Sequence, residues 1–195
     1  MALSPLALHD LTEAVLGCVC AALEATAEEV DDQPGCPDCR ACVVPGQAAW
    51  DSCADPCTGD AGGQLSVNVA RIYPSTVFPA EDREVRGVRH CAPPATTAVE
   101  LVITLLRCAP GPDVNGCPPA CEELAAAARV LHVDAVTVYN ALLCCLPGTS
   151  ARRRGRKFVL GAQRTIGPEG GCVGIEQRVT VALPGCAPCP GEEAS

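Results

Sequence analysis

Cysteine is the residue type in this chain with the widest range of chemistry, because thiolates bind metals, attack electrophiles and form disulfides. The chain contains 16 Cys among its 195 residues. Five of them share a loop rich in Gly, Pro and Asp: Cys36, Cys39, Cys42, Cys53 and Cys57. Without Cys42, their spacing is C-x2-C-x13-C-x3-C, which is typical of zinc sites in which two close pairs of thiolates hold one metal ion.

Disulfides are an alternative for the same loop, and free thiols are a third. A loop of this composition buries too little apolar surface to order itself, so we predict that it is cross-linked or metal-bound. We favour disulfides over a zinc site at Cys36, Cys39, Cys53 and Cys57, and so expect no cofactor. Cys42 makes the group odd, which leaves one thiol for a partner such as Cys91, Cys186 or Cys189. Four other cysteines lie in helical apolar patterns, where we expect them to pack as small hydrophobic side chains: Cys18, Cys20, Cys144 and Cys145.

The remaining residues with catalytic potential form no recognisable constellation. His9, His90 and His132 are scattered, and none has the spacing that would pair it with a nucleophile or a metal ligand. The acidic pair Glu122-Glu123 suits the first turn of a helix, where it complements the helix dipole. We therefore predict that the chain is not an enzyme.

The charge of the chain limits its partners. Its 14 basic and 23 acidic residues give a formal net charge of −9, which disfavours general binding to nucleic acid. Five basic residues nevertheless cluster within six positions: Arg152, Arg153, Arg154, Arg156 and Lys157. Three interpretations of the cluster are open: a solvated loop, a contact with an acidic neighbouring subunit, and a face toward packaged DNA. We expect it to serve subunit contacts or to face a channel, and not to bind free DNA tightly.

Composition and length predict one domain over residues 1–195, with a core built from Ala, Val, Leu and Cys because aromatic residues make up only 3%. We expect no membrane span, because no apolar run reaches the roughly 18 residues that a span requires. The first residues lack the positive region of a secretory signal, so we expect synthesis in the cytosol.

Hydrophobic periodicity predicts the order of the elements. A helix over residues 6–30 precedes the cysteine-rich loop at 31–63, and a strand follows from residue 65 to about residue 74. Residues 75–94 are too polar for the core and form a candidate contact arm that includes Phe78, Glu81, Asp82 and Arg83. A central strand at 96–108, a helical region ending at Pro147 and a β-hairpin at 158–183 complete the chain. His132-Val133-Asp134 is a candidate break in that helical region, with Asp134 as the cap of a second helix. The predicted fold is α+β: a mostly antiparallel sheet with two main helices packed on it, long loops and a β-hairpin arm.

Several short motifs accompany this order of elements. They are Arg71-Ile72-Tyr73-Pro74, Phe78-Pro79, Ala98-Val99-Glu100-Leu101, the helix ending Leu142-Leu143-Cys144-Cys145, and the hairpin segment Gly167-Pro168-Glu169-Gly170-Gly171. Over residues 6–30 and 64–184 the chain resembles the tail terminator proteins of long-tailed bacteriophages, particularly those of high-GC actinobacterial hosts. The cysteine-rich loop departs from the better-known members.

The resemblance implies a homohexameric ring that caps the tail tube, stops its growth and joins it to a head-side neck or stopper protein. Packaged DNA would at most pass through the channel, no membrane would be involved, and the mature location would be the neck of the virion. Release of virions at lysis would reconcile cytosolic synthesis with late disulfide formation. Two alternatives stay open: another neck or tail-completion protein of the virion, and a cysteine-rich zinc-binding or redox module.

Overall fold

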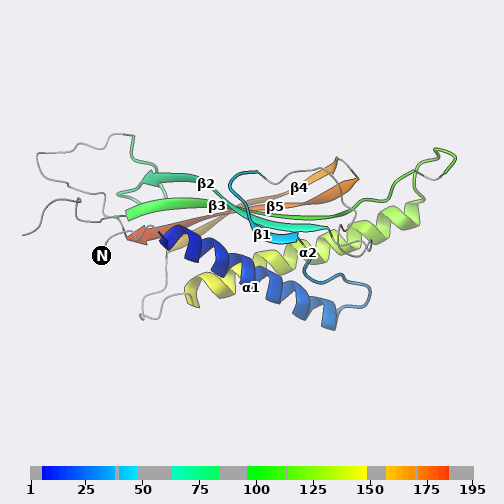
Figure 1. Ribbon diagram of the computed structural model, residues 1–195, viewed down its shortest axis with the longest axis horizontal. Coiled ribbons are helices and arrows are strands. Elements are labelled where there is room, and N and C mark those ends of the chain that lie inside the picture. The colour runs from blue at the N-terminus through cyan, green and yellow to red at the C-terminus, as the bar shows by residue number, and fades with distance from the viewer. Residues whose placement is uncertain are drawn as a thin grey trace, which may run out of the picture.

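The chain folds into two layers in a computed structural model that describes residues 6–37, 40–47, 63–83, 96–112, 114–148, 157–169 and 171–184. Both helices lie against one face of the sheet (Figure 1). In chain order the elements are α1 (Ala7–Glu29), β1 (Ala41–Val43), β2 (Gln64–Pro74), β3 (Thr96–Cys108), α2 (Cys121–Gly148), β4 (Phe158–Glu169) and β5 (Cys172–Pro184).

The sheet has the strand order β1-β2-β3-β5-β4, with β3 at its centre. β1 pairs parallel to β2, and all the other pairs are antiparallel. The predicted α+β class, the central strand and the closing hairpin are therefore confirmed. β1 is an addition that the sequence did not predict, because three residues inside a loop carry too little periodicity to be recognised.

The core lies between the helices and the inner face of the sheet. The central strand β3 contributes its alternate side chains Val99, Leu101, Ile103 and Leu105. The helix α1 meets them with Leu11, Val15, Val19 and Leu23, whose spacing of four residues places them on one face. Aliphatic side chains thus fill this interior, as the low aromatic content predicts.

Helix α2 is continuous for 28 residues, so the candidate break at residues 132–134 is wrong. Asp134 is completely buried in mid-helix, and it does not cap a helix. Between Cys121 and Leu146, α2 is long and apolar enough to cross a membrane by length and composition alone, a property that the core helix of a soluble protein can share. The side chains of Val138, Leu142 and Leu146 pack in the core.

The first part of the candidate contact arm is a compact turn. Asp82 accepts hydrogen bonds from the backbone N–H of Thr76 at 2.8 Å and from its hydroxyl at 2.7 Å. Tyr73 donates its hydroxyl proton to the backbone oxygen of Pro79 at 3.0 Å. Residues 75–83 therefore lie close to the end of β2, and residues 84–94 of the predicted arm lie outside the described residues.

Candidate functional site

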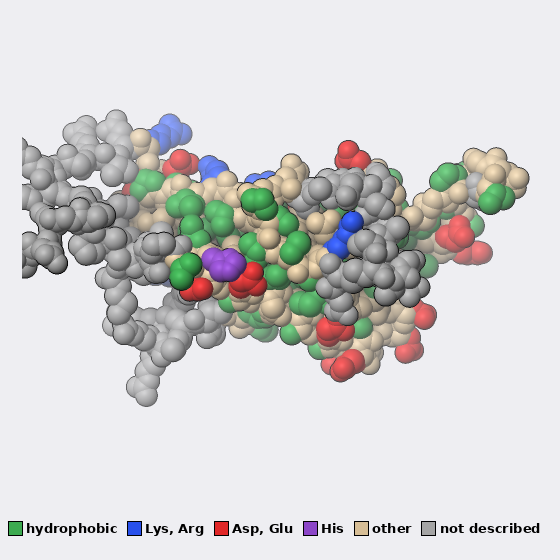
Figure 2. Space-filling view, in the orientation of Figure 1, with side chains coloured by type: hydrophobic (Ala, Val, Ile, Leu, Met, Phe, Trp, Pro, Cys, Tyr) green, Lys and Arg blue, Asp and Glu red, His purple; other side chains and the backbone are tan. Residues whose placement is uncertain are grey.

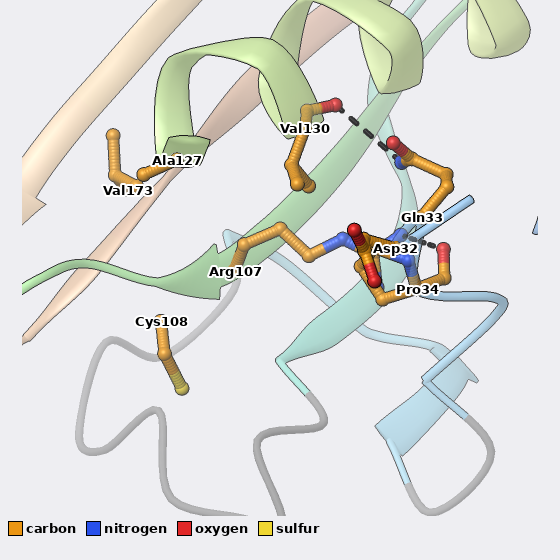
Figure 3. A pocket seen from close by; sticks show the side chains of 8 residues that line it. All are labelled: Asp32, Gln33, Pro34, Arg107, Cys108, Ala127, Val130 and Val173. Carbon is orange, nitrogen blue, oxygen red and sulfur yellow. Dashed lines mark hydrogen bonds between the residues drawn. The ribbon is translucent and has the colours of Figure 1, made fainter. Parts of the chain in front are cut away.

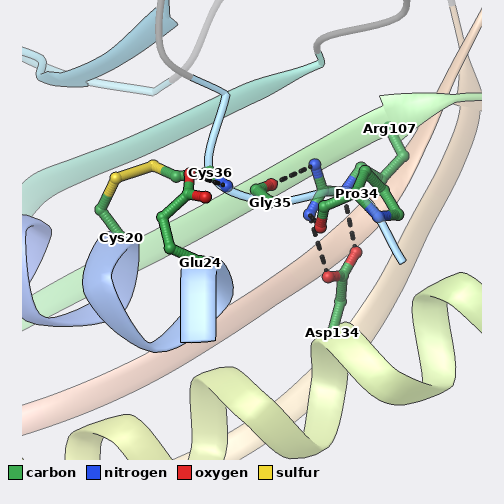
Figure 4. The surroundings of a disulfide bond; sticks show 7 residues. All are labelled: Cys20, Glu24, Pro34, Gly35, Cys36, Arg107 and Asp134. Atoms are coloured by element: carbon green, nitrogen blue, oxygen red, sulfur yellow. Dashed lines mark hydrogen bonds and ion pairs between the residues drawn. A yellow bond between two sulfur atoms is a disulfide. The ribbon is translucent and has the colours of Figure 1, made fainter. Parts of the chain in front are cut away.

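A buried ion pair connects β3 with the middle of α2 (Figure 4). Nε of Arg107 lies 2.8 Å from Oδ2 of Asp134, and Nη2 of Arg107 lies 3.0 Å from Oδ1. The same guanidinium donates to the backbone oxygens of Gly35 at 2.9 Å and Pro34 at 3.1 Å. Gln33 adds a third hydrogen bond to Asp134, at 2.8 Å. These bonds hold β3, α2 and the segment after α1 together at one point.

A disulfide between Cys20 and Cys36 fixes the same segment to α1, with the two Cα atoms 5.0 Å apart (Figure 4). Glu24 accepts a hydrogen bond from the backbone N–H of Cys36 at 2.8 Å. A Cβ atom at Gly35 would lie 2.6 Å from that carboxylate, so a larger residue would have to displace the Glu24 side chain from Cys36. Cys36 is thus cross-linked as predicted, but its partner is a helix cysteine that the sequence assigned to core packing.

The disulfide argues against the alternative zinc site, because an oxidised Cys36 cannot supply a thiolate. Its three other predicted ligands, Cys39, Cys53 and Cys57, lie outside the described residues. Among the residues that the structure does describe, no group of three or more His, Cys, Asp or Glu side chains is placed to hold a metal ion.

A second disulfide joins the two helices. Cys18 of α1 bonds to Cys145 of α2, with the Cα atoms 6.4 Å apart. Cys144 is an exposed thiol. Cys18 and Cys20 pack against the core as predicted, but both also form disulfides, as does Cys145, and Cys144 is exposed. An apolar helical pattern surrounds all four, so it could not separate a disulfide from a buried thiol.

A cavity of about 430 Å³ opens beside the ion pair (Figure 3). It is lined by Asp32, Gln33, Pro34, Arg107, Cys108, Ala127, Val130 and Val173. The guanidinium of Arg107 is already bound to Asp134 and to two backbone oxygens. Burial raises the pKa of the Cys108 thiol, against the smaller opposing effects of Arg107 and of the backbone of Gly63. A thiol with a raised pKa is a weak nucleophile at neutral pH, so these two residues give the cavity little catalytic capacity.

Charged side chains form a ladder across the sheet face that points away from the helices. Glu100 of β3 lies 2.9 Å from Nε of Arg71 and 2.8 Å from Nη1 of Arg178. Glu176 of β5 lies 3.0 Å from Nε of Arg178 and 2.9 Å from Nη2 of Arg164. Burial raises the pKa of Glu100, but the hydrogen bonds and charges of its two arginines outweigh that effect and hold the pKa below the ordinary value of 4.5. The ladder neutralises this face and ties β2, β3, β5 and β4 together.

The predicted interface residues fall into two groups. Glu81 pairs with Arg71 at 3.2 Å, Asp82 holds the turn, Phe78 is half-buried and Arg83 is exposed. Of the basic cluster, Lys157 is exposed, while Arg152, Arg153, Arg154 and Arg156 lie outside the described residues. Glu81 and Asp82 thus have local structural roles, and an intersubunit role for any member of these groups stays a prediction.

The sequence did not predict a stripe on α2 that is exposed except for the half-buried Ala128, and we call it the α2 stripe: Ala125, Ala128, His132, Val136, Tyr139 and Leu143. These residues follow one another at intervals of three or four, so they share one face of the helix. Val136, Tyr139 and Leu143 are 60%, 44% and 42% exposed. The sequence contains a pattern that could have predicted the stripe. Helix α2 is apolar around most of its circumference, but a helix in a two-layer fold buries only part of that circumference, so some apolar residues must stay exposed.

The α2 stripe lies on the flank of the molecule where the sheet ends. A cleft of about 210 Å³ separates Ala128 and His132 of α2 from Gln163 and Thr165 of β4. β4 is the terminal strand of the sheet, and its Val159, which is 42% exposed, lies opposite Thr180 on the face that points away from the helices. Acidic side chains gather elsewhere, over α1 and at the projecting end of α2 (Figure 2).

Comparison with known proteins identifies no relative: no protein-family model matches the chain, and no curated protein matches it.

Proposed function

We propose that the chain is a structural virion protein, a tail terminator without catalytic activity that assembles as a ring of six, caps the tail tube and joins it to a head-side neck protein. The order of the elements and the short motifs described above support this proposal. The observation that carries it is the uncovered flank formed by the α2 stripe and the terminal strand β4. Large apolar side chains that lie exposed together on one helix face are typical of a surface that another chain covers.

A ring requires heterologous contacts, in which one surface of a subunit meets a different surface of the next. The flank supplies one of the two surfaces, because β4 offers a strand edge and α2 offers apolar side chains beside it. The second surface would include the contact arm or the helices of the neighbour. The basic cluster at 152–157 would contribute polar contacts around this apolar centre.

Imaging tests the proposal directly. Particles that carry this chain with a C-terminal peptide tag are labelled with an antibody and examined by cryo-electron microscopy. We expect label at the junction of tail tube and head, and a ring of six copies there after averaging. Label at another position in the neck would reassign the chain to a different neck or tail-completion protein. Particles without label would refute the virion role altogether.

A further inference from the structure

The residues of the α2 stripe are arranged so that the stripe complements itself. Its amino-terminal half carries the small side chains Ala125 and Ala128, and its carboxyl-terminal half carries the large side chains Val136, Tyr139 and Leu143. An antiparallel copy of the helix, centred near residue 134, would set Ala125 opposite Leu143, Ala128 opposite Tyr139, and His132 opposite Val136. Small side chains would then face large ones along the contact, which is the pattern that lets two helices interlock.

We infer that the free protein is a two-fold dimer in which the α2 stripe packs antiparallel against the α2 stripe of a second copy. A two-fold contact uses the same patch on both subunits, so self-complementarity is the property that it requires. This contact would cover the exposed parts of Val136, Tyr139 and Leu143 together. The inference goes beyond the proposed ring, because it concerns the protein before assembly.

The distribution of charge favours a second copy as the occupant. Two chains of net charge −9 repel each other, so a contact between two identical patches is favoured where the patch is poor in acidic groups. The α2 stripe contains no acidic residue, whereas α1 carries Asp10 and Glu13 among its exposed side chains.

The dimer and the ring require different kinds of contact at this flank. A two-fold contact makes the two faces of an assembly equivalent, whereas a cap that joins two different partners needs two different faces. The α2 pairing therefore belongs to the free protein, where it covers the ring-forming flank. It would be exchanged for heterologous contacts when the subunit docks on the tail tube.

The test uses the full oxidised chain in sedimentation equilibrium, with a pair of compensating substitutions. We expect the wild type to have twice the 20.0 kDa mass of one chain. Ala128→Trp should place a bulky ring against Tyr139 of the second copy and weaken dimerisation by a factor of about 30 or more, as at an interface hot spot. Combining it with Tyr139→Ala should restore the dimer, because the space vacated on one copy accepts the ring of the other. The matched control is Ala126→Trp, since Ala126 is exposed on the same helix but outside the stripe.

The outcomes separate the possible occupants. A wild type that remains monomeric at every concentration, or dimers that Ala128→Trp leaves intact while circular dichroism shows a folded protein, would overturn the inference. Flotation of the wild type with neutral phosphatidylcholine vesicles, abolished by Leu143→Asp, would also overturn it and assign the stripe to a lipid surface. A six-chain species that Ala128→Trp does not affect would refute the pairing and would support a ring that forms through surfaces other than the α2 stripe. Dimers restored by the double substitution would support the pairing even if imaging placed no ring in the particle.

Discussion

Removal of the charge of Asp134 should destabilise the protein strongly. The carboxylate is completely buried and accepts three hydrogen bonds, two from Arg107 and one from Gln33. Asp134→Asn leaves the guanidinium of Arg107, whose side chain is only 7% exposed, without its counter-charge. Breaking a buried pair by removing one partner costs about 3–5 kcal/mol, because the remaining charge stays desolvated. We therefore expect the free energy of unfolding to fall by about that amount.

Urea unfolding of the oxidised protein, followed by circular dichroism, measures this loss from the shift of the midpoint at constant slope. Replacing both partners, as Arg107→Met with Asp134→Leu, should recover part of the stability, because no unpaired charge remains but Gln33 and the backbone oxygens of Pro34 and Gly35 lose their hydrogen bonds. The control is Glu81→Gln at the exposed end of the charge ladder, where both side chains of the pair are about half exposed; its expected cost is about 0–1 kcal/mol. A loss below about 1 kcal/mol for Asp134→Asn, or a double variant as unstable as the single one, would refute this account of the ion pair.

Three further predictions concern the charge ladder, a disulfide and the basic cluster. The folded-state pKa of Glu100 lies below its ordinary value of 4.5, so its ion pairs stabilise the protein above pH 4.5 and are lost as the pH falls through the folded-state pKa. Glu100→Gln should therefore lower stability at pH 7, and its effect in unfolding titrations should disappear as the pH falls through that pKa. Cys20→Ser opens the loop between residues 20 and 36, whose sequence separation is 16, and should lower the free energy of unfolding of the oxidised protein by about 3 kcal/mol. Equal unfolding midpoints for the variant and the wild type without reductant would contradict this expectation. Replacing all five basic residues between Arg152 and Lys157 by Ser should reduce the yield of infectious particles but leave the circular dichroism spectrum unchanged; submicromolar DNA binding by the wild type with a steep salt dependence would contradict the contact role.

Local periodicity accounts for what the sequence predicted well. The apolar repeat of α1 and the two-sided apolar run of β3 carry enough residues to fix both the type and the position of each element. The partners of the cysteines could not be predicted in this way. Cys36 is close to Cys39 in the sequence, so spacing grouped these two cysteines, whereas in the fold Cys36 bonds to Cys20 of α1. Proximity along the chain is a poor guide to the partner of a cysteine at the border of a loop.

Asp134 shows the same limit for a polar residue. In its local context, an aspartate after His132-Val133 is typical of a helix cap. Its partner Arg107 lies 27 residues earlier on another element, and only the packing of α2 across the sheet brings the two together. A carboxylate inside an apolar helical pattern can indicate either a helix break or a buried ion pair. Here local propensity favoured the break, which is wrong.

The ion pair and the α2 stripe are two consequences of how α2 is oriented. The helix is apolar around most of its circumference, so hydrophobic burial alone would allow it to turn about its axis and bury Tyr139 and Leu143 in place of Ala141 and Leu142. The bonds from Asp134 to Arg107 and from Cys145 to Cys18 both lie on the side of α2 away from the stripe, and each is satisfied in only one rotation. Buried polar groups can thus specify a single packing even where they add little net stability. In this chain, they hold three large apolar side chains on the surface, where another chain can cover them.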